Sequence, residues 1–106
     1  MLNSSSRGFG MKVKVRAMGI LKKALGKEEL FLHIDTLGEA RLRDVIKKIL
    51  EEASSLKDVL LDPELKDPSP NTIVLINGKE MRLLGGINAV IRDGDEIVLI
   101  PVVHGG

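Results

Sequence analysis

The sequence predicts an α+β domain in which one main helix packs across one face of a mixed sheet. Three observations support this prediction. Residues near the N-terminus alternate between apolar and polar, the middle of the chain has the 3.6-residue period of a helix, and an apolar strand stands close to the C-terminus. A chain of 106 residues is long enough to form one such core.

The first two patterned segments predict an antiparallel hairpin. In residues 11–17 apolar side chains alternate strictly with basic ones, which is the two-residue period of a half-buried strand. Residues 28–34 repeat the pattern, with leucines and an isoleucine facing inward and Phe31 and His33 facing outward. Residues 19–27, which contain two glycines and three lysines, are expected to form the turn region between the two strands.

An amphipathic helix is predicted next. Its apolar stripe recurs at i, i+3, i+4, i+7 and i+8, at Leu42, Val45, Ile46, Ile49 and Leu50. We expect this stripe to lie on the sheet, with Val15, Ile46 and Ile49 between sheet and helix. A helical continuation is predicted through residues 55–62, ending at Pro63 and followed by a loop that contains further prolines.

The C-terminal half predicts strands joined by tight turns. Residues 72–76 form a strand that closes at Asn77-Gly78, a strong signal for a two-residue hairpin turn. A short strand within residues 79–84 pairs back, and the chain then turns at Gly85-Gly86 and again in residues 92–96.

Within the final strand, residues 96–102, the stretch 97–100 is apolar on both faces. A helical connection cannot close a hairpin, so we expect a parallel strand pair, with the last strand beside the first. The two alternating sets of the final strand are Ile97 with Leu99, and Val98 with Ile100 and Val102. One helix covers only one face of a sheet, so one set is shielded by neighbouring long side chains or forms a docking patch for a partner.

Charge and composition exclude several classes of function. Sixteen basic and fifteen acidic residues give a net charge of +1, and the only aromatic residues are Phe9 and Phe31, so the chain lacks the basic field and stacking platforms of a nucleic-acid-binding β domain. No apolar run approaches the roughly 20 residues of a membrane span. The absence of cysteine excludes disulfides and thiolate metal sites and favours a cytoplasmic location.

The sequence does not predict a catalytic site or a metal site. The two histidines lie in different parts of the pattern, His33 in a strand and His104 near the C-terminus, so they do not make a metal site or a nucleophile–base pair. Asp93, Asp95 and Glu96 lack the spacing of a calcium-binding loop and are expected to form a turn. A stand-alone enzyme is therefore not expected.

The C-terminal third of the chain carries a resemblance to a known family. The stretch VLINGKEMRLLGGINAVIRDGDEIVLIPVVHGG combines Asn-Gly, Leu-x-Gly-Gly, Asp-Gly-Asp-Glu, an apolar strand and a final Gly-Gly. It resembles the ubiquitin-like sulfur carriers of the MoaD, ThiS and ubiquitin-related modifier families, which include the small archaeal modifiers. The stretch MKVKVRAMGILKKALGKEEL similarly resembles the opening strand and turn of MoaD. The resemblance implies a β-grasp domain over residues 11–102, between a flexible extension, residues 1–10, and a flexible tail, residues 103–106.

The resemblance also assigns the chemistry to the tail. It implies that the carboxylate of Gly106 is activated as an acyl adenylate by a ubiquitin-activating-type adenylyltransferase similar to MoeB or ThiF. That partner would use ATP and Mg²⁺, whereas this chain would bind no cofactor and would not itself be an enzyme. Gly105 and Gly106 would pass through a narrow channel of the partner, with His104 beside them. The implied docking surface lies on the sheet face beside the tail, at Leu84, Val98, Ile100 and Val102.

Several roles remain open within this family. The activated tail could become a thiocarboxylate for molybdopterin synthesis, with this chain as the small subunit beside a MoaE-like large subunit, or for transfer-RNA thiolation. It could instead be joined to lysines of target proteins. The single Pro101 and the His-Gly-Gly ending look more like the ubiquitin-related modifier than like MoaD. Arg41 stands where these families often place a threonine cap, so Asp35 or Thr36 is expected to cap the helix. The plain alternative is that the last two glycines are a frayed end.

Overall fold

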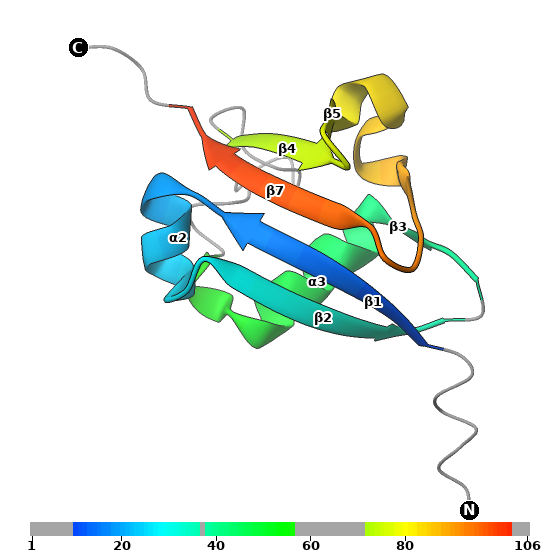
Figure 1. Ribbon diagram of the computed structural model, residues 1–106, viewed down its shortest axis with the longest axis horizontal. Helices are drawn as coiled ribbons and strands as arrows, with labels where there is room; N and C mark the ends of the chain where they lie inside the picture. The colour runs from blue at the N-terminus through cyan, green and yellow to red at the C-terminus, as the bar shows by residue number, and fades with distance from the viewer. Residues whose placement is uncertain (1–9, 37, 57–71, 103–106) are drawn as a thin grey trace, which may run out of the picture.

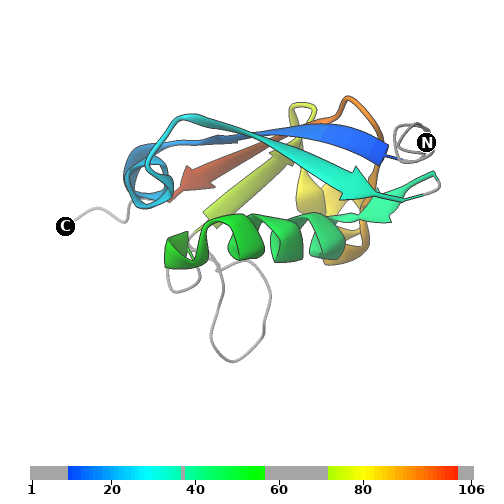
Figure 2. The same ribbon diagram turned by 90° about the horizontal axis from the view of Figure 1, so that it is seen from below.

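A five-stranded mixed sheet with one helix across a single face forms the body of the protein (Figures 1 and 2). This computed structural model describes residues 10–36, 38–56 and 72–102. The strands follow the order β2-β1-β7-β4-β5, and Figure 2 shows α3 lying across one face of the sheet. The predicted α+β class is confirmed.

The elements follow one another as strands, short helices and tight turns. Their bounds are β1 (Gly10–Ala17), α2 (Gly19–Leu25), β2 (Glu29–Asp35), β3 (Ala40–Arg41), α3 (Leu42–Glu52), the 3₁₀ turn η1 (Ser54–Leu56), β4 (Thr72–Ile76), β5 (Lys79–Glu80), the 3₁₀ turns η2 (Met81–Leu84) and η3 (Gly86–Asn88), β6 (Val90–Ile91) and β7 (Glu96–Pro101).

The strand pairing follows from the connections. The hairpin β1–β2 and the pair β4–β7 are antiparallel, whereas β7 lies parallel to β1 at the centre of the sheet. The expected parallel pair between the first and last strands is therefore confirmed. The two-residue strands β3 and β6 form a separate small ladder, which the sequence pattern did not predict.

The core fills the space between α3 and the sheet. Val15, Ile46 and Ile49 are all buried there, as predicted, and Ile97 and Leu99 project from the central strand into the same core. The apolar stripe of α3 and the inward set of each strand meet in this layer, so among the described residues one face of the sheet is covered and the other is not.

The predicted tight turns are confirmed by their backbone geometry. Asn77 and Gly78 both have positive φ angles, of 50° and 86°, as a two-residue hairpin turn between β4 and β5 requires. In the turn before β7, Gly94 has a φ of 88°, and Asp95 accepts a hydrogen bond at 2.8 Å from the Arg92 amide. Within the described ranges no group of three or more His, Asp or Glu side chains is placed so that it could hold a metal ion.

The expectation that residues 19–27 form only a turn is wrong, because Gly19–Leu25 is the helix α2. Burial of one side chain and a C-terminal cap stabilise this helix. Leu21 is buried in the core, and Gly26 ends the helix in a left-handed conformation, with its amide donating to the carbonyl of Lys22 at 2.9 Å.

The main helix was also predicted to continue through residues 55–62, and this prediction is wrong for residues 55 and 56, which belong to the 3₁₀ turn η1. Helix α3 ends at Glu52, and the chain then turns so that Leu56 becomes fully buried and the Ser55 hydroxyl donates to the carbonyl of Ala24 at 2.7 Å. Burial of Leu56 against α2 requires this change of direction. Residues 57–71, with Pro63, lie outside the described residues.

Neither Asp35 nor Thr36 caps α3. The chain is still extended at Arg41, because β3 pairs with β6 there, so the helix cannot begin earlier. The Arg41 amide instead donates to the carboxylate of Asp44, at 2.9 Å, and the Thr36 hydroxyl donates to the carbonyl of Glu39. An aspartate in the first helical turn thus replaces the expected cap.

The short strand predicted within residues 79–84 is present only as Lys79–Glu80. From Met81 the chain forms the 3₁₀ turn η2, because Met81 turns into the core while the Glu80 carboxylate accepts from the Arg82 amide at 2.6 Å. The turn predicted at Gly85-Gly86 is confirmed, and Gly85 has a φ of 107°.

Candidate docking surface at the C-terminal end of β7

The uncovered face of the sheet becomes more apolar toward the C-terminal end of β7. Cross-strand neighbours on this face are Ile73 with Ile100 and Leu75 with Val98, on β4 and β7. The alternating set Val98, Ile100 and Val102 therefore faces away from α3, and Ile73, Leu75, Ile100 and Val102 are half-buried. No element of the described chain covers this apolar surface from outside, as Figure 2 shows for the side of the sheet opposite α3.

Met18 extends this surface across β1. Its amide donates to the carbonyl of Leu99 at 3.1 Å, which continues the ladder between β1 and β7 by one residue. Because Ala17 is paired with Leu99 and both face the core, the alternation of strands places Met18 on the same face as Ile100. Met18, Ile100 and Ile73 thus form an apolar row across three strands where β7 ends.

A network of ion pairs occupies the same face farther from that end. The Arg16 guanidinium lies 3.3 Å from Glu28 and 3.9 Å from both Glu29 and Glu96, and Lys14 lies 3.3 Å from Glu29. Each such exposed pair contributes little to stability on its own. Together the pairs surround Arg16 with carboxylates and mark where the face changes from apolar to charged.

Val98 is only 8% exposed, because Arg16 is its neighbour on β1. Of the residues predicted to dock a partner, Val98 therefore offers little surface of its own. Ile100 and Val102 lie at the apolar end, where Pro101 ends β7. His104, Gly105 and Gly106 fall outside the described residues.

Leu84 lies elsewhere. It belongs to η2, which packs against β4, β5 and η3 at the edge of the sheet, whereas Ile100 is on the central strand. Leu84 is 38% exposed and its neighbour Leu83 is 81% exposed. The structure thus brings Ile100 and Val102 together at the end of β7 and places Leu84 on a separate edge.

Phe31 and His33 face outward from β2, as predicted. Both are at the charged end of the uncovered face, and the Lys12 ammonium lies 6.0 Å from the centre of the Phe31 ring. The structure therefore separates these two residues from the apolar row around Ile100.

Sequence reasoning missed Met18 and Ile20, which flank the end of β7 and are 39% and 58% exposed. Residues 20–25, ILKKAL, consist largely of good helix formers, and this signal could have revealed α2. Two exposed apolar residues at the start of a short helix would then have stood out.

The sheet order and the single helix across one face define the class of this protein: it has the β-grasp fold of ubiquitin-like proteins. No helix within the described ranges is long and apolar enough to cross a membrane. The ThiS family matches residues 22–106, and the chain belongs to that family.

Known relatives carry two kinds of description. The chain is 32% identical to the ubiquitin-related modifier 1 homolog of Dictyostelium discoideum, over 91% of this chain and 100% of that protein. It is 29% identical to the sulfur carrier protein CysO of Mycobacterium tuberculosis, over the same shares of the two chains. The solution structure of small archaeal modifier protein 1 from Methanosarcina acetivorans matches with a TM-score of 0.76 and 30% identity, over 93% of this chain and 100% of that chain. The chain is thus a member of a family of ubiquitin-like sulfur carriers and modifiers.

Proposed function

We propose that this protein is a sulfur carrier whose C-terminal carboxylate, on Gly106, is adenylated by a partner and then converted to a thiocarboxylate. One observation carries the proposal. The uncovered sheet face is apolar where β7 ends, at Ile73, Ile100 and Met18, immediately before the residues that would react. The match to the ThiS family also runs to Gly106.

The chemistry requires activation because a carboxylate is a poor electrophile. A carboxylate oxygen of Gly106 attacks the α-phosphorus of ATP, pyrophosphate leaves, and the acyl adenylate forms. A hydrosulfide-level sulfur donor then attacks the acyl carbon, a carbon–sulfur bond forms, the bond to the AMP oxygen breaks, and AMP leaves. ATP and Mg²⁺ are used by the activating enzyme in this scheme, and the carrier supplies only the reacting carboxylate.

Docking on the sheet face brings the carboxylate to the partner's active site. The five residues from Val102 to Gly106 span at most about 18 Å when extended. A partner bound over Ile100 therefore needs its nucleotide within that distance of Pro101. Gly105 and Gly106 have no side chains to obstruct a narrow channel, and we assign His104 to the mouth of that channel.

The partner is an adenylyltransferase of the ubiquitin-activating type in this proposal, and the setting is the cytoplasm. We propose two acceptors for the sulfur. One is a molybdopterin precursor, reached together with a MoaE-like subunit, and the other is transfer RNA. The identity of the acceptor determines which second partner must bind the same face after the activating enzyme leaves.

A second function is favoured by the similarity to a ubiquitin-related modifier over the full length of that relative. In this function a lysine amine of a target protein attacks the same acyl adenylate, an amide bond forms, and AMP leaves with loss of a proton from the amine. The two functions share every step up to the adenylate, so they differ only in the nucleophile.

Intact mass spectrometry of the protein recovered from its source cells tests both functions. A fraction in which one terminal oxygen has been replaced by sulfur supports the carrier, and a branch from Gly106 to a lysine of another protein supports the modifier. If neither species appears, and a chain lacking Gly105-Gly106 complements a deletion strain, the proposal is wrong.

A further inference from the structure

Helix α2 lies against the point where β7 ends. A β-carbon added to Gly19 would lie 2.9 Å from Cγ of Pro101, and the neighbouring Met18 is hydrogen-bonded to Leu99. Figure 1 shows α2 beside the C-terminal end of β7. Any partner that reaches the chain beyond Pro101 must therefore pass close to this helix.

The helix exposes apolar side chains at this position. Five large apolar residues in the described ranges are exposed, and two of them, Met18 and Ile20, belong to the start of α2. Met18 adjoins Ile100 on the uncovered sheet face, and Ile20 follows two residues later in the first turn of α2. Exposed apolar side chains are therefore present both at the end of the sheet and at the start of α2.

Basic residues border the apolar part of α2. Gly19 and Gly26, with Lys22, Lys23 and Lys27, line an open hollow of about 380 Å³. Lys22 lies 3.7 Å from the Glu28 carboxylate, whereas Lys23 and Lys27 are exposed and make no ion pair with any described residue. The start of the helix is therefore apolar, and the segment from Lys22 to Lys27, which is the end of α2 and the turn after it, is basic.

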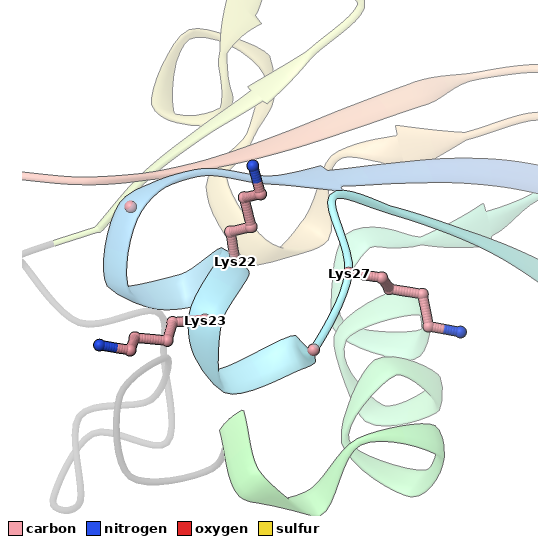
Figure 3. A pocket seen from close by; sticks show the side chains of 5 residues that line it. Lys22, Lys23 and Lys27 are labelled. Atoms are coloured by element: carbon pink, nitrogen blue, oxygen red, sulfur yellow. The ribbon is translucent and has the colours of Figure 1, made fainter.

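The three lysines do not converge on a small ligand. Figure 3 shows Lys22, Lys23 and Lys27 pointing away from one another, out of the hollow they line. A phosphate or nucleotide would need ammonium groups aimed at one point. Divergent lysines instead suit a broad acidic surface, which meets several separated charges at once.

We propose that α2 is a second arm of the docking surface, which binds an acidic rim beside an apolar hollow on the activating enzyme. This inference rests on the proposed function. In this complex Ile20 and Met18 insert into the apolar hollow of the partner, and Lys23 and Lys27 face the carboxylates of the partner's acidic rim. A partner that contacts both Ile100 and Ile20 is held over the end of β7. This position brings its active site close to the residues that follow Pro101.

A second copy of this chain does not suit the same surface. In a symmetric contact whose axis passes through this surface, Lys23 and Lys27 of the two copies would face one another, and like charges across an interface are unfavourable. The charge of α2 therefore favours a different protein with acidic residues at its contact.

Charge reversal tests the basic segment formed by the end of α2 and the turn after it. The double variant Lys23→Glu/Lys27→Glu is compared with Lys47→Glu/Lys79→Glu, which changes the net charge equally at exposed lysines on α3 and at the start of β5. The binding partner in this experiment is the activating enzyme. It is purified from the source cells by following the release of pyrophosphate from ATP when this chain is added. Stopped-flow association should slow about tenfold for the α2 variant at low salt, and the control should change less than twofold.

Salt dependence separates electrostatic steering from a folding defect. The Debye length falls from about 10 Å at 0.1 M salt to about 3 Å at 1 M, so the difference between the α2 variant and the control should shrink at high salt. A slower rate that persists at 1 M salt contradicts steering by Lys23 and Lys27. Thermal melts of both variants should match the unaltered chain, because all four side chains are exposed.

Ile20→Ser tests the apolar half. Dissociation of the complex should become about three- to tenfold faster with little change in association, because short-range contacts act mainly on the off-rate. Phe31→Ser is the matched control, since Phe31 is as exposed as Ile20, at 58%, but lies on β2 at the charged end of the sheet.

The outcomes distinguish this inference from the proposed function. If the unaltered chain stimulates pyrophosphate release but both α2 variants bind like their controls, α2 is not a docking arm and the carrier function stands. If purified activating enzymes release no pyrophosphate with the unaltered chain, the proposed function itself fails.

Discussion

Gly19 and Pro101 are packed so closely that a side-chain carbon added to Gly19 would force one of the two residues to shift. An ideal β-carbon on Gly19 would lie 2.9 Å from Cγ of Pro101, and Gly19 also has a φ of +56°. This contact joins α2 to the end of the central strand, so it holds the helix where the chain leaves the sheet.

Gly19→Ala should therefore destabilise the protein for two reasons. A non-glycine residue with this φ costs about 1–2 kcal/mol, and the contact with Pro101 adds a steric cost. Urea denaturation should show a loss larger than that of Gly26→Ala, which has a φ of +87° but open space around it. Gly38→Ala has neither constraint and should stay within about 0.5 kcal/mol of the unaltered chain. Equal losses for Gly19→Ala and Gly26→Ala would mean that Pro101 simply moves away.

The core between helix and sheet predicts a second result. Ile49 is fully buried on the face of α3 that packs on the sheet, so Ile49→Ala should lower the free energy of unfolding by about 2–5 kcal/mol. Lys47→Ala on the exposed face of the same helix should change it by less than about 0.5 kcal/mol. A denaturant melt that shows no loss for Ile49→Ala would contradict the docking of α3.

Ile100 tests the uncovered sheet face. Ile100→Arg should leave the melting temperature nearly unchanged, because the side chain is half-buried and faces away from α3, and it should weaken the complex with the activating enzyme at least tenfold. His33→Arg places the same charge at the other end of that face and should bind normally. Ile97→Arg, in contrast, would bury a charge in the core and should unfold the protein. Unfolding of Ile100→Arg as well would contradict the assignment of this face.

The tail predicts a separation of stability from activity. Deletion of Gly105-Gly106 should change the free energy of unfolding by less than about 0.5 kcal/mol and should remove all adenylate, thiocarboxylate and conjugate. Gly106→Ala keeps the carboxylate but adds a methyl group, so activation should fall sharply if the channel fits only backbone. A C-terminal amide keeps the shape and removes the attacking oxygen, and it should not be activated. Pyrophosphate release and intact mass report the activation of all three forms. Activation of the chain that lacks Gly105-Gly106 would contradict the proposal.

Local periodicity determined much of this protein. The alternation in residues 11–17, the stripe of α3 and the signal Asn77-Gly78 each depend on neighbours within a few positions, so the strands, the helix and the hairpin turn could be predicted. The apolar character of β7 on both faces was sufficient to expect one uncovered set of side chains. The resemblance of the C-terminal third to the ubiquitin-like sulfur carriers was sufficient to predict a reacting carboxylate at Gly106.

Tertiary structure alone decided what surrounds the end of β7. A seven-residue helix is not stable by itself, and α2 exists because Leu21 is buried and Gly19 packs on Pro101. Likewise, the separation of Leu84 from Ile100, and the position of Met18 beside Ile100, depend on strand order and register. Periodicity along one segment specifies which face a side chain occupies, but its neighbour across the sheet belongs to a strand distant in sequence, and only the folded chain brings the two together.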